Sequence, residues 1–148
     1  MQPAKHEAGQ ALSTAEDVKR EFFFPEGLLG FVTPRYFTLT PYLPPDTSPS
    51  PFFVLQARDD DLCFPLISPA LLTADYDPSI PSELLAKLGA AAADEVVTFA
   101  IVTLRDQVEE ITVNLQGPVV VNPRSRLGFQ IVAEQYPLRQ PLLAPLRA

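Results

Sequence analysis

Prolines are the feature that most restricts the fold of this chain. There are 17 of them against 6 glycines in 148 residues. An internal proline costs a helix roughly 3 kcal/mol, because it lacks the amide N–H and its ring clashes with the preceding turn. The proline count therefore argues against an all-helical chain and favours many short strands joined by stiff loops.

The clearest strand signal lies between Ile111 and Val132. Runs rich in Val, Ile and Thr are separated there by Gly117-Pro118 and by residues 122–126. β-Branched residues fit a pleated surface, whereas Gly-Pro and Asn-Pro pairs interrupt regular structure, so the stretch predicts a small antiparallel meander of three runs. Its first run alternates apolar side chains with the polar side chains of Thr112, Asn114 and Gln116. The polar face is either plain solvent-facing sheet or a docking site.

Further apolar runs predict strands at 21–24, 35–40, 52–57, 62–67 and 95–103, the last of them central and covered on both faces. Pro65 predicts an edge position or a bulge in its strand. One short helix is expected near residues 81–88, with Pro81 at its first position and Gly89 just past its end. Residues 58–61 are expected to form a hairpin connection between two of the strands.

The length of the chain is typical of one domain. We therefore expect an all-β, mainly antiparallel, single-domain barrel-like sheet of about eight short strands with one short helix. Its domain spans residues 21–140. Residues 1–20 are expected to be a flexible extension, and residues 141–148 a loose tail.

Charge and composition restrict the partners. The net charge is −7, and the basic residues are scattered, so direct binding to a nucleic acid is not expected. An acidic surface suits a basic protein partner or simple solubility. The sequence contains no apolar run long enough for a membrane span and no hydrophobic segment near Met1 that resembles a signal peptide, which favours the cytoplasm. Cys63 is the only cysteine, which is compatible with a reducing compartment.

Few residues carry the chemistry that an enzyme needs. His6 is the only histidine, and Cys63 is expected to be a buried small hydrophobe without a histidine to activate it. The run Asp59-Asp60-Asp61 is either a solvated hairpin tip or an acidic metal site, and it lacks the ligand spacing of a calcium loop. Asp75 and Asp77 are expected to bond local backbone amides in a turn before Pro78. We expect a protein that acts by binding, without an enzymatic activity, a metal or a cofactor.

Several motifs, taken together and in order, resemble the family of flagellar assembly factors called FliW. Phe24-Pro25-Glu26-Gly27-Leu28-Leu29-Gly30-Phe31 is similar to the opening motif of that family. The further motifs are 51–57 through Phe64, 75–78, 100–103, 112–115, 118–122, 130–132 and the closing Tyr136-Pro137-Leu138. The resemblance covers residues 21–138. The sequence departs from the family pattern at Gln116-Gly117, at Ala57-Arg58 and at Pro81, where partner contacts or local geometry are expected to differ.

The resemblance implies a binding protein with a barrel-like fold. Members of the family bind newly made flagellin and, when flagellin is scarce, the RNA-binding translational repressor CsrA, which relieves repression of flagellin mRNA. On that basis we expect flagellin and CsrA as partners of a cytoplasmic monomer. The polar positions that flank the meander and the acidic hairpin are the candidate partner-binding residues, namely Asp59, Asp60, Asp61, Asp75, Tyr76, Asn114 and Gln116.

Two other interpretations remain open at this point. One is a hydrolase or a small-ligand-binding barrel whose pocket is lined by Tyr36, Tyr76 and Tyr136. The absence of a nucleophile with a histidine beside it argues against the hydrolase. The other is a structural subunit of a larger assembly, which would associate stably with itself.

Overall fold

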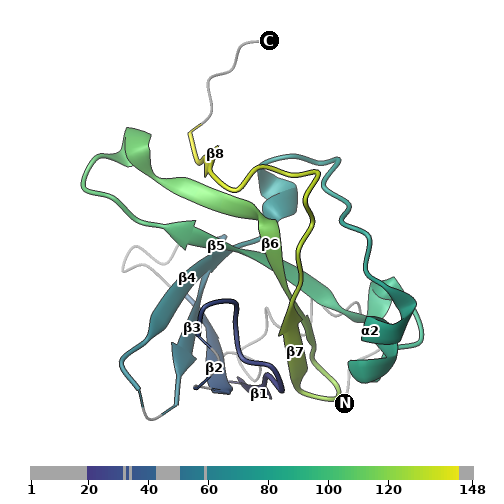
Figure 1. Ribbon diagram of the computed structural model, residues 1–148. Coiled ribbons are helices and arrows are strands. Elements are labelled where there is room, and N and C mark those ends of the chain that lie inside the picture. Colours follow the sequence, from purple (N-terminus) through teal and green to yellow (C-terminus); the bar gives the residue numbers. More distant parts are fainter. Residues whose placement is uncertain (1–19, 32, 34, 43–50, 59, 144–148) are drawn as a thin grey trace.

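The computed structural model describes residues 20–31, 33, 35–42, 51–58 and 60–143 (Figure 1). Most of the expected N-terminal extension and residues 144–148 of the expected tail lie outside this range. The strands are β1 (Arg20–Phe23), β2 (Tyr36–Pro41), β3 (Phe52–Ala57), β4 (Cys63–Ile67), β5 (Val97–Thr103), β6 (Thr112–Asn122), β7 (Leu127–Gln130) and β8 (Gln140–Pro141). The helical elements are the α-helix α2 (Ser82–Lys87) and the 3₁₀ turns η3 (Pro69–Leu71), η4 (Ala93–Glu95) and η5 (Val108–Glu110).

The first seven of these strands close into a barrel. Each of them pairs antiparallel with the next one along the chain, from β1 to β7. A short parallel contact between Phe23 of β1 and Leu127 of β7 closes the ring, and the N–H of Phe23 donates to the carbonyl of Arg126 at 2.8 Å. β8 is an additional strand that pairs with the first residues of β6. The predicted all-β, mainly antiparallel barrel of about eight strands is therefore confirmed.

The barrel encloses a core of apolar side chains. Four phenylalanines from three strands and the turn after β1 fill most of it, namely Phe22, Phe24, Phe37 and Phe99, none of them more than 2% exposed. Aliphatic side chains from β2, β3, β4 and β6 complete it. Burial of this kind contributes about 25 cal/mol per Å² of apolar surface, which makes the core the main source of stability. The interior is thus occupied by the protein's own side chains.

Two smaller apolar clusters lie outside the barrel wall. One contains Val113 and Leu115 of β6 and is covered by Tyr76, Tyr136 and Leu142. The other contains Leu88, Val120 and Phe129, against which Leu84 of α2 packs. β6 is therefore covered on both faces over much of its length, which explains why most of its residues are buried.

The predicted break at Gly117-Pro118 is wrong. β6 runs through these two buried residues as one strand of 11 residues. The register against β5 shifts there: Phe99 pairs with Val119, but Ile101 pairs with Asn114. Residues 115–118 of β6 therefore form a bulge opposite Ala100, which accommodates a proline within a strand because a bulge needs fewer ladder bonds.

The short helix is confirmed, but its first residue differs from the expected one. Pro81 has ψ 143° and occupies the N-cap, so the helix begins at Ser82. Gly89 follows the helix with φ +75°, in the left-handed region that favours glycine. Beyond it, η4 occupies residues 93–95, so β5 begins at Val97 and not at residue 95.

The expectation of a buried Cys63 is also wrong. Its side chain is exposed, because it lies on the outward face of β4 opposite the exposed Gln56. Pro65 lies in β4, which pairs with β3 throughout but with β5 only at Leu66 and Ile67. The β4–β5 ladder therefore ends at Pro65, which has no N–H to extend it, while the β3–β4 ladder continues past this residue.

The segment after β7, residues 131–142, runs back along β6, and we call it the strap (Figure 1, yellow). The N–H groups of Ile131 and Ala133 donate to the carbonyls of Pro118 and Gln116. Further along, the N–H of Leu142 donates to the carbonyl of Ile111 at 2.9 Å, and Leu142 packs on the cluster that contains Val113 and Leu115. Residues 141 and 142, expected to begin a loose tail, are thus held against the sheet.

Candidate protein-interaction surfaces

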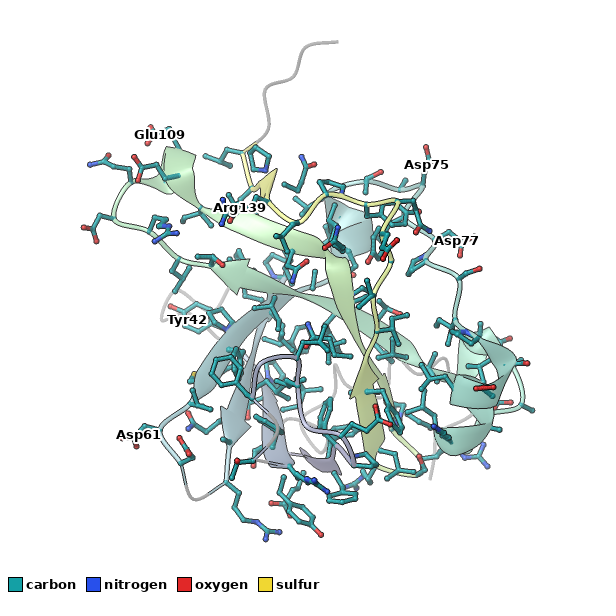
Figure 2. The ribbon with its side chains drawn as sticks, viewed as in Figure 1. Tyr42, Asp61, Asp75, Asp77, Glu109 and Arg139 are labelled. Carbon is teal, nitrogen blue, oxygen red and sulfur yellow. The ribbon has the colours of Figure 1, made fainter. Side chains whose placement is uncertain are left out.

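The structure divides the predicted partner-binding residues between two parts of the molecule. One group lies at β6, beside the strap, and contains Tyr76, Asn114 and Gln116, with Asp75 directly before Tyr76 in the chain. The other group contains Asp60 and Asp61, which lie in the β3–β4 hairpin. Figure 2 shows Asp61 and Asp75 at opposite sides of the barrel. Asp59 lies outside the described residues. The six described residues therefore do not form one continuous surface.

Two tyrosines fasten the strap to the segment that precedes α2. The hydroxyl of Tyr76 donates to the carbonyl of Leu115 at 2.7 Å, and its ring lies 4.4 Å from the ring of Tyr136. The hydroxyl of Tyr136 accepts a hydrogen bond from the N–H of Asp77 at 2.9 Å. Burial, and to a lesser degree the neighbouring Tyr136, raise the pKa of Tyr76 well above its ordinary value. Tyr76 therefore stays neutral and acts as a structural contact between three segments.

Asn114 stabilises the bulge of β6 from within. Its side-chain oxygen accepts hydrogen bonds from the N–H groups of Gln116 and Gly117, at 3.0 and 2.9 Å. Gln130 completes the arrangement, because its side-chain nitrogen donates to the carbonyl of Gly117 at 2.8 Å and its side-chain oxygen accepts from the N–H of Leu29. The amide oxygen of Asn114 is thus used inside the fold. Gln116 is half-buried, and its side chain lies 3.5 Å from the carbonyl oxygen of Tyr136.

The loop that Gln130 holds presents apolar side chains to the solvent. Leu28 is buried, but Leu29 and Phe31 are 54% and 40% exposed. Phe31 is supported by an edge-to-face contact with Phe64, with the ring centroids 5.3 Å apart. Val132, two residues beyond Gln130, is 56% exposed. We call Leu29, Phe31 and Val132 the apolar surface. Sequence reasoning missed it, because the run Leu28-Leu29 gives no sign of which leucine faces inward.

The β5–β6 hairpin carries a second exposed group. Its connection, residues 104–111, extends away from the barrel (Figure 1). The exposed apolar residues there are Leu104 and Val108, and exposed acids accompany them at Asp106, Glu109 and Glu110. Figure 2 shows Glu109 at the far end of this hairpin. The connection therefore exposes apolar and acidic side chains together, and one basic side chain, Arg105, beside them.

The β3–β4 hairpin uses one of its acids internally. A side-chain oxygen of Asp60 accepts a hydrogen bond from the N–H of Leu62 at 3.0 Å, while Gln56 donates to the carbonyl of Asp60 at 3.2 Å. Asp61 is exposed. Within the described part of the chain, no group of three or more His, Cys, Asp or Glu residues is placed to hold a metal ion. Both described acids are exposed, and Asp60 differs from Asp61 in that it also bonds the N–H of Leu62.

The three tyrosines of the alternative ligand pocket do not come together. Tyr36 lies at the start of β2, where its ring is 4.8 Å from that of Phe23 and 4.2 Å from the guanidinium carbon of Arg58. Arg58 also forms a two-bond ion pair with Glu21, both bonds 2.8 Å long, and this contact lowers the pKa of Glu21. The predicted pocket is therefore wrong, because Tyr36 packs on Phe23 and Arg58, whereas Tyr76 pairs with Tyr136.

These observations define the class of the protein: a small closed β-barrel with a filled interior, whose distinctive groups lie on its outside. Among the described residues no helix has the length and apolar character needed to cross a membrane. The sequence model of the family described as FliW protein matches residues 4–142. The chain belongs to the FliW family of flagellar assembly factors.

Individual relatives agree with this assignment. The chain is 37% identical over 138 residues to a protein described as flagellar assembly factor FliW from Magnetococcus marinus, covering 91% of this chain and 83% of the relative. It is 34% identical over 129 residues to a protein of the same description from Caldicellulosiruptor saccharolyticus, covering 85% and 82%. A crystal structure of the flagellar assembly factor FliW has a TM-score of 0.69 to this structure at 28% identity, covering 87% of this chain and 86% of that one.

Proposed function

We propose that this protein binds flagellin and, when flagellin is scarce, binds the translational repressor CsrA and thereby relieves repression of flagellin mRNA translation. The observation that carries the proposal is the match to the FliW family over residues 4–142, which includes the complete barrel. The net charge of −7 supports it, because an acidic protein is attracted to a basic RNA-binding partner. We infer that the protein acts as a monomer in the cytoplasm.

The partner switch requires coupling between two binding events. If flagellin displaces the repressor, binding of one partner must weaken binding of the other, and the coupling free energy is the same in both directions. The barrel offers separate places for such contacts, because the apolar surface lies on other elements than the β3–β4 and β5–β6 hairpins, which we call the acidic hairpins. Overlapping contacts or a change of shape would each produce the coupling.

Titration calorimetry with the purified protein tests the proposal directly. The protein is titrated with flagellin alone, with CsrA alone and with CsrA in the presence of saturating flagellin. We expect binding in the first two titrations and a loss of CsrA affinity of at least about tenfold in the third, within the usual range of coupling between sites. Absence of binding to either partner, or equal CsrA affinity with and without flagellin, would refute the switch.

The acidic hairpins make a second, more local test possible. Asp61→Lys reverses an exposed charge on the β3–β4 hairpin without touching the turn bond made by Asp60. We expect slower association with CsrA, with a larger effect at low salt because screening is weaker there. Glu83→Lys makes the same charge change on the exposed face of α2 and serves as the matched control. Equal association rates for the two variants at low salt would show that the β3–β4 hairpin is not part of the interface with CsrA.

A further inference from the structure

A pocket opens on the outer wall of the barrel, between the segment that precedes α2 and β5. Its volume is about 190 Å³. Four pieces of chain contribute to it: the η3 turn, the segment 76–80, Ala93 of η4 and Thr98 of β5. Its lining includes no residue of the apolar surface or of the β3–β4 and β5–β6 hairpins, and it shares Tyr76 with the predicted partner-binding residues.

The walls of this pocket combine an apolar lining with one acid. Pro69, Pro78 and Ile80 supply apolar surface, and Ser68 and Thr98 supply hydroxyl groups. Asp77 is the one carboxylate-bearing residue in the lining, and no Lys, Arg or His is present there. The N–H of Asp77 donates to the hydroxyl of Tyr136, so the backbone that carries the carboxylate is fixed.

The ring of Tyr76 forms another part of the lining. Its hydroxyl donates to the carbonyl of Leu115 and is therefore engaged within the fold. The ring packs against the ring of Tyr136, and where it lines the pocket it presents an aromatic surface. Aromatic rings attract cations by about 0.5–1 kcal/mol at exposed sites. The lining therefore combines one carboxylate-bearing residue, two hydroxyl-bearing residues and an aromatic ring, which are groups that bind a cationic or polar ligand.

Size and charge restrict the occupant. A cavity of about 150 Å³ holds a benzene molecule, so this pocket has room for one long side chain. Asp77 is exposed, so its carboxylate is hydrated in the free protein. An anionic ligand would be repelled by this charge, an uncharged ligand would gain nothing from it, and a cationic ligand would be attracted to it. A lysine or arginine side chain fits both the apolar residues and the acid of the lining. Its aliphatic stem packs on apolar surface, while its cationic head lies near the carboxylate.

We propose that this pocket receives a lysine or arginine side chain presented by a partner protein. The stem lies against Pro78 and Ile80, and the cationic head pairs with Asp77 near the ring of Tyr76. The proposal goes beyond the partner switch, because it assigns a pocket and a ligand chemistry that hold whichever protein supplies the side chain. It stands or fails independently of binding to flagellin or CsrA.

Small probes test the pocket without any partner. The protein is labelled with ¹⁵N and titrated with N-acetyl-L-arginine methylamide, N-acetyl-L-lysine methylamide and the uncharged N-acetyl-L-norleucine methylamide. We expect saturable shifts of the amide signals of Asp77, Ala93 and Thr98 with both cationic probes, and at least about fivefold weaker binding of the norleucine probe. Equal affinity for norleucine, or no saturable shift with either cationic probe, would overturn the proposal.

Matched variants assign the effect to the pocket. Asp77→Asn removes the charge and keeps the backbone N–H that bonds Tyr136, so we expect about fivefold weaker binding of the cationic probes. Asp75→Asn makes the same change two residues earlier, at an exposed position outside the lining, and we expect less than a twofold effect. Both acids are labelled in Figure 2. Ala70→Leu fills the pocket from the exposed η3 turn and is expected to abolish saturable binding.

The outcome for Asp75 decides between the pocket and the general charge of the segment. If Asp75→Asn weakens binding as much as Asp77→Asn, the probes respond to local charge alone and the pocket assignment fails. Amide spectra of the unliganded variants establish that each one is folded. If Ala70→Leu does not fold, the comparison of the two asparagine variants still decides the question.

Discussion

The carbonyl of Leu88 at the end of α2 offers the sharpest test of how the helix is attached to the barrel. It accepts a hydrogen bond from the side-chain nitrogen of Asn122 at 2.8 Å and another from the hydroxyl of Ser125 at 2.7 Å. Asn122 also accepts a hydrogen bond from the N–H of Arg124 at 2.9 Å. The perturbation is a double-mutant cycle: Asn122→Ala, Ser125→Ala and the two together.

The expected magnitudes follow from burial. Asn122 is 1% exposed and Leu88 is fully buried, whereas Ser125 is exposed. Asn122→Ala removes two hydrogen bonds of about 1 kcal/mol each and leaves a small cavity, so we expect a loss of about 2–3 kcal/mol in the free energy of unfolding. Ser125→Ala should cost about 0.5–1 kcal/mol. The double variant leaves the buried carbonyl without either donor, so it should lose about 1 kcal/mol more than the sum of the single losses.

Urea unfolding followed by far-ultraviolet circular dichroism measures these values, and the sequence contains no tryptophan to provide a fluorescence signal. Ser82→Ala, at an exposed position in the first turn of α2, is the control and should stay within about 0.5 kcal/mol of the wild type. Additive losses, within about 0.3–0.5 kcal/mol, would show that the two donors do not share the carbonyl in solution and would refute the reasoning.

Three further predictions concern the bulge, the strap and the first strand. Gly117→Ala places a Cβ 2.9 Å from the side-chain nitrogen of Gln130, so we expect a loss of about 1–3 kcal/mol in thermal or urea unfolding; an unchanged midpoint would contradict the tight bulge. Because the pKa of Tyr76 is raised in the folded state, its contribution to stability is complete below about pH 10, the ordinary tyrosine value, and is lost as the pH rises above it. Unfolding curves between pH 9 and 11 should be steeper in pH for the wild type than for Tyr76→Phe, and parallel curves would dispose of the argument. The pKa of Glu21 is lowered by Arg58, so the pair contributes above the ordinary glutamate value of 4.5 and is lost as the pH falls below it. Both side chains are partly exposed, so Glu21→Gln should cost no more than about 0.5 kcal/mol at pH 7 and nothing at pH 3, as measured by urea unfolding.

The barrel class was predictable because its signals are local. The alternation in residues 35–40, the apolar run at 52–57 and the glycine after α2 each report on neighbours a few residues away. The continuity of β6 was not predictable from such signals. Gly117-Pro118 interrupts a strand by propensity, and the bulge that accommodates the pair depends on Gln130, thirteen residues further along. One local signal was available: an asparagine three residues before a glycine is able to bond its backbone N–H.

The candidate surfaces were less predictable than the fold. Sequence patterns indicate which residues are polar, but they do not show that Asn114 turns its side-chain oxygen inward or that Asp60 bonds its own turn. They also do not show that Leu29 is exposed while Leu28 is buried, because a turn decides between them. The pocket beside Asp77 depends on four pieces of chain, and only the tertiary structure brings these together.

The parallel contact between Phe23 and Leu127 has a consequence for synthesis on the ribosome. The two residues are 127 − 23 = 104 positions apart, so β1 emerges long before the strand that completes the ring. At about 5–20 residues per second, the nascent chain waits about 5–20 seconds with one edge of β1 unpaired. An unpaired strand edge is a template for association with other chains. The barrel therefore closes only after residue 127 has been translated.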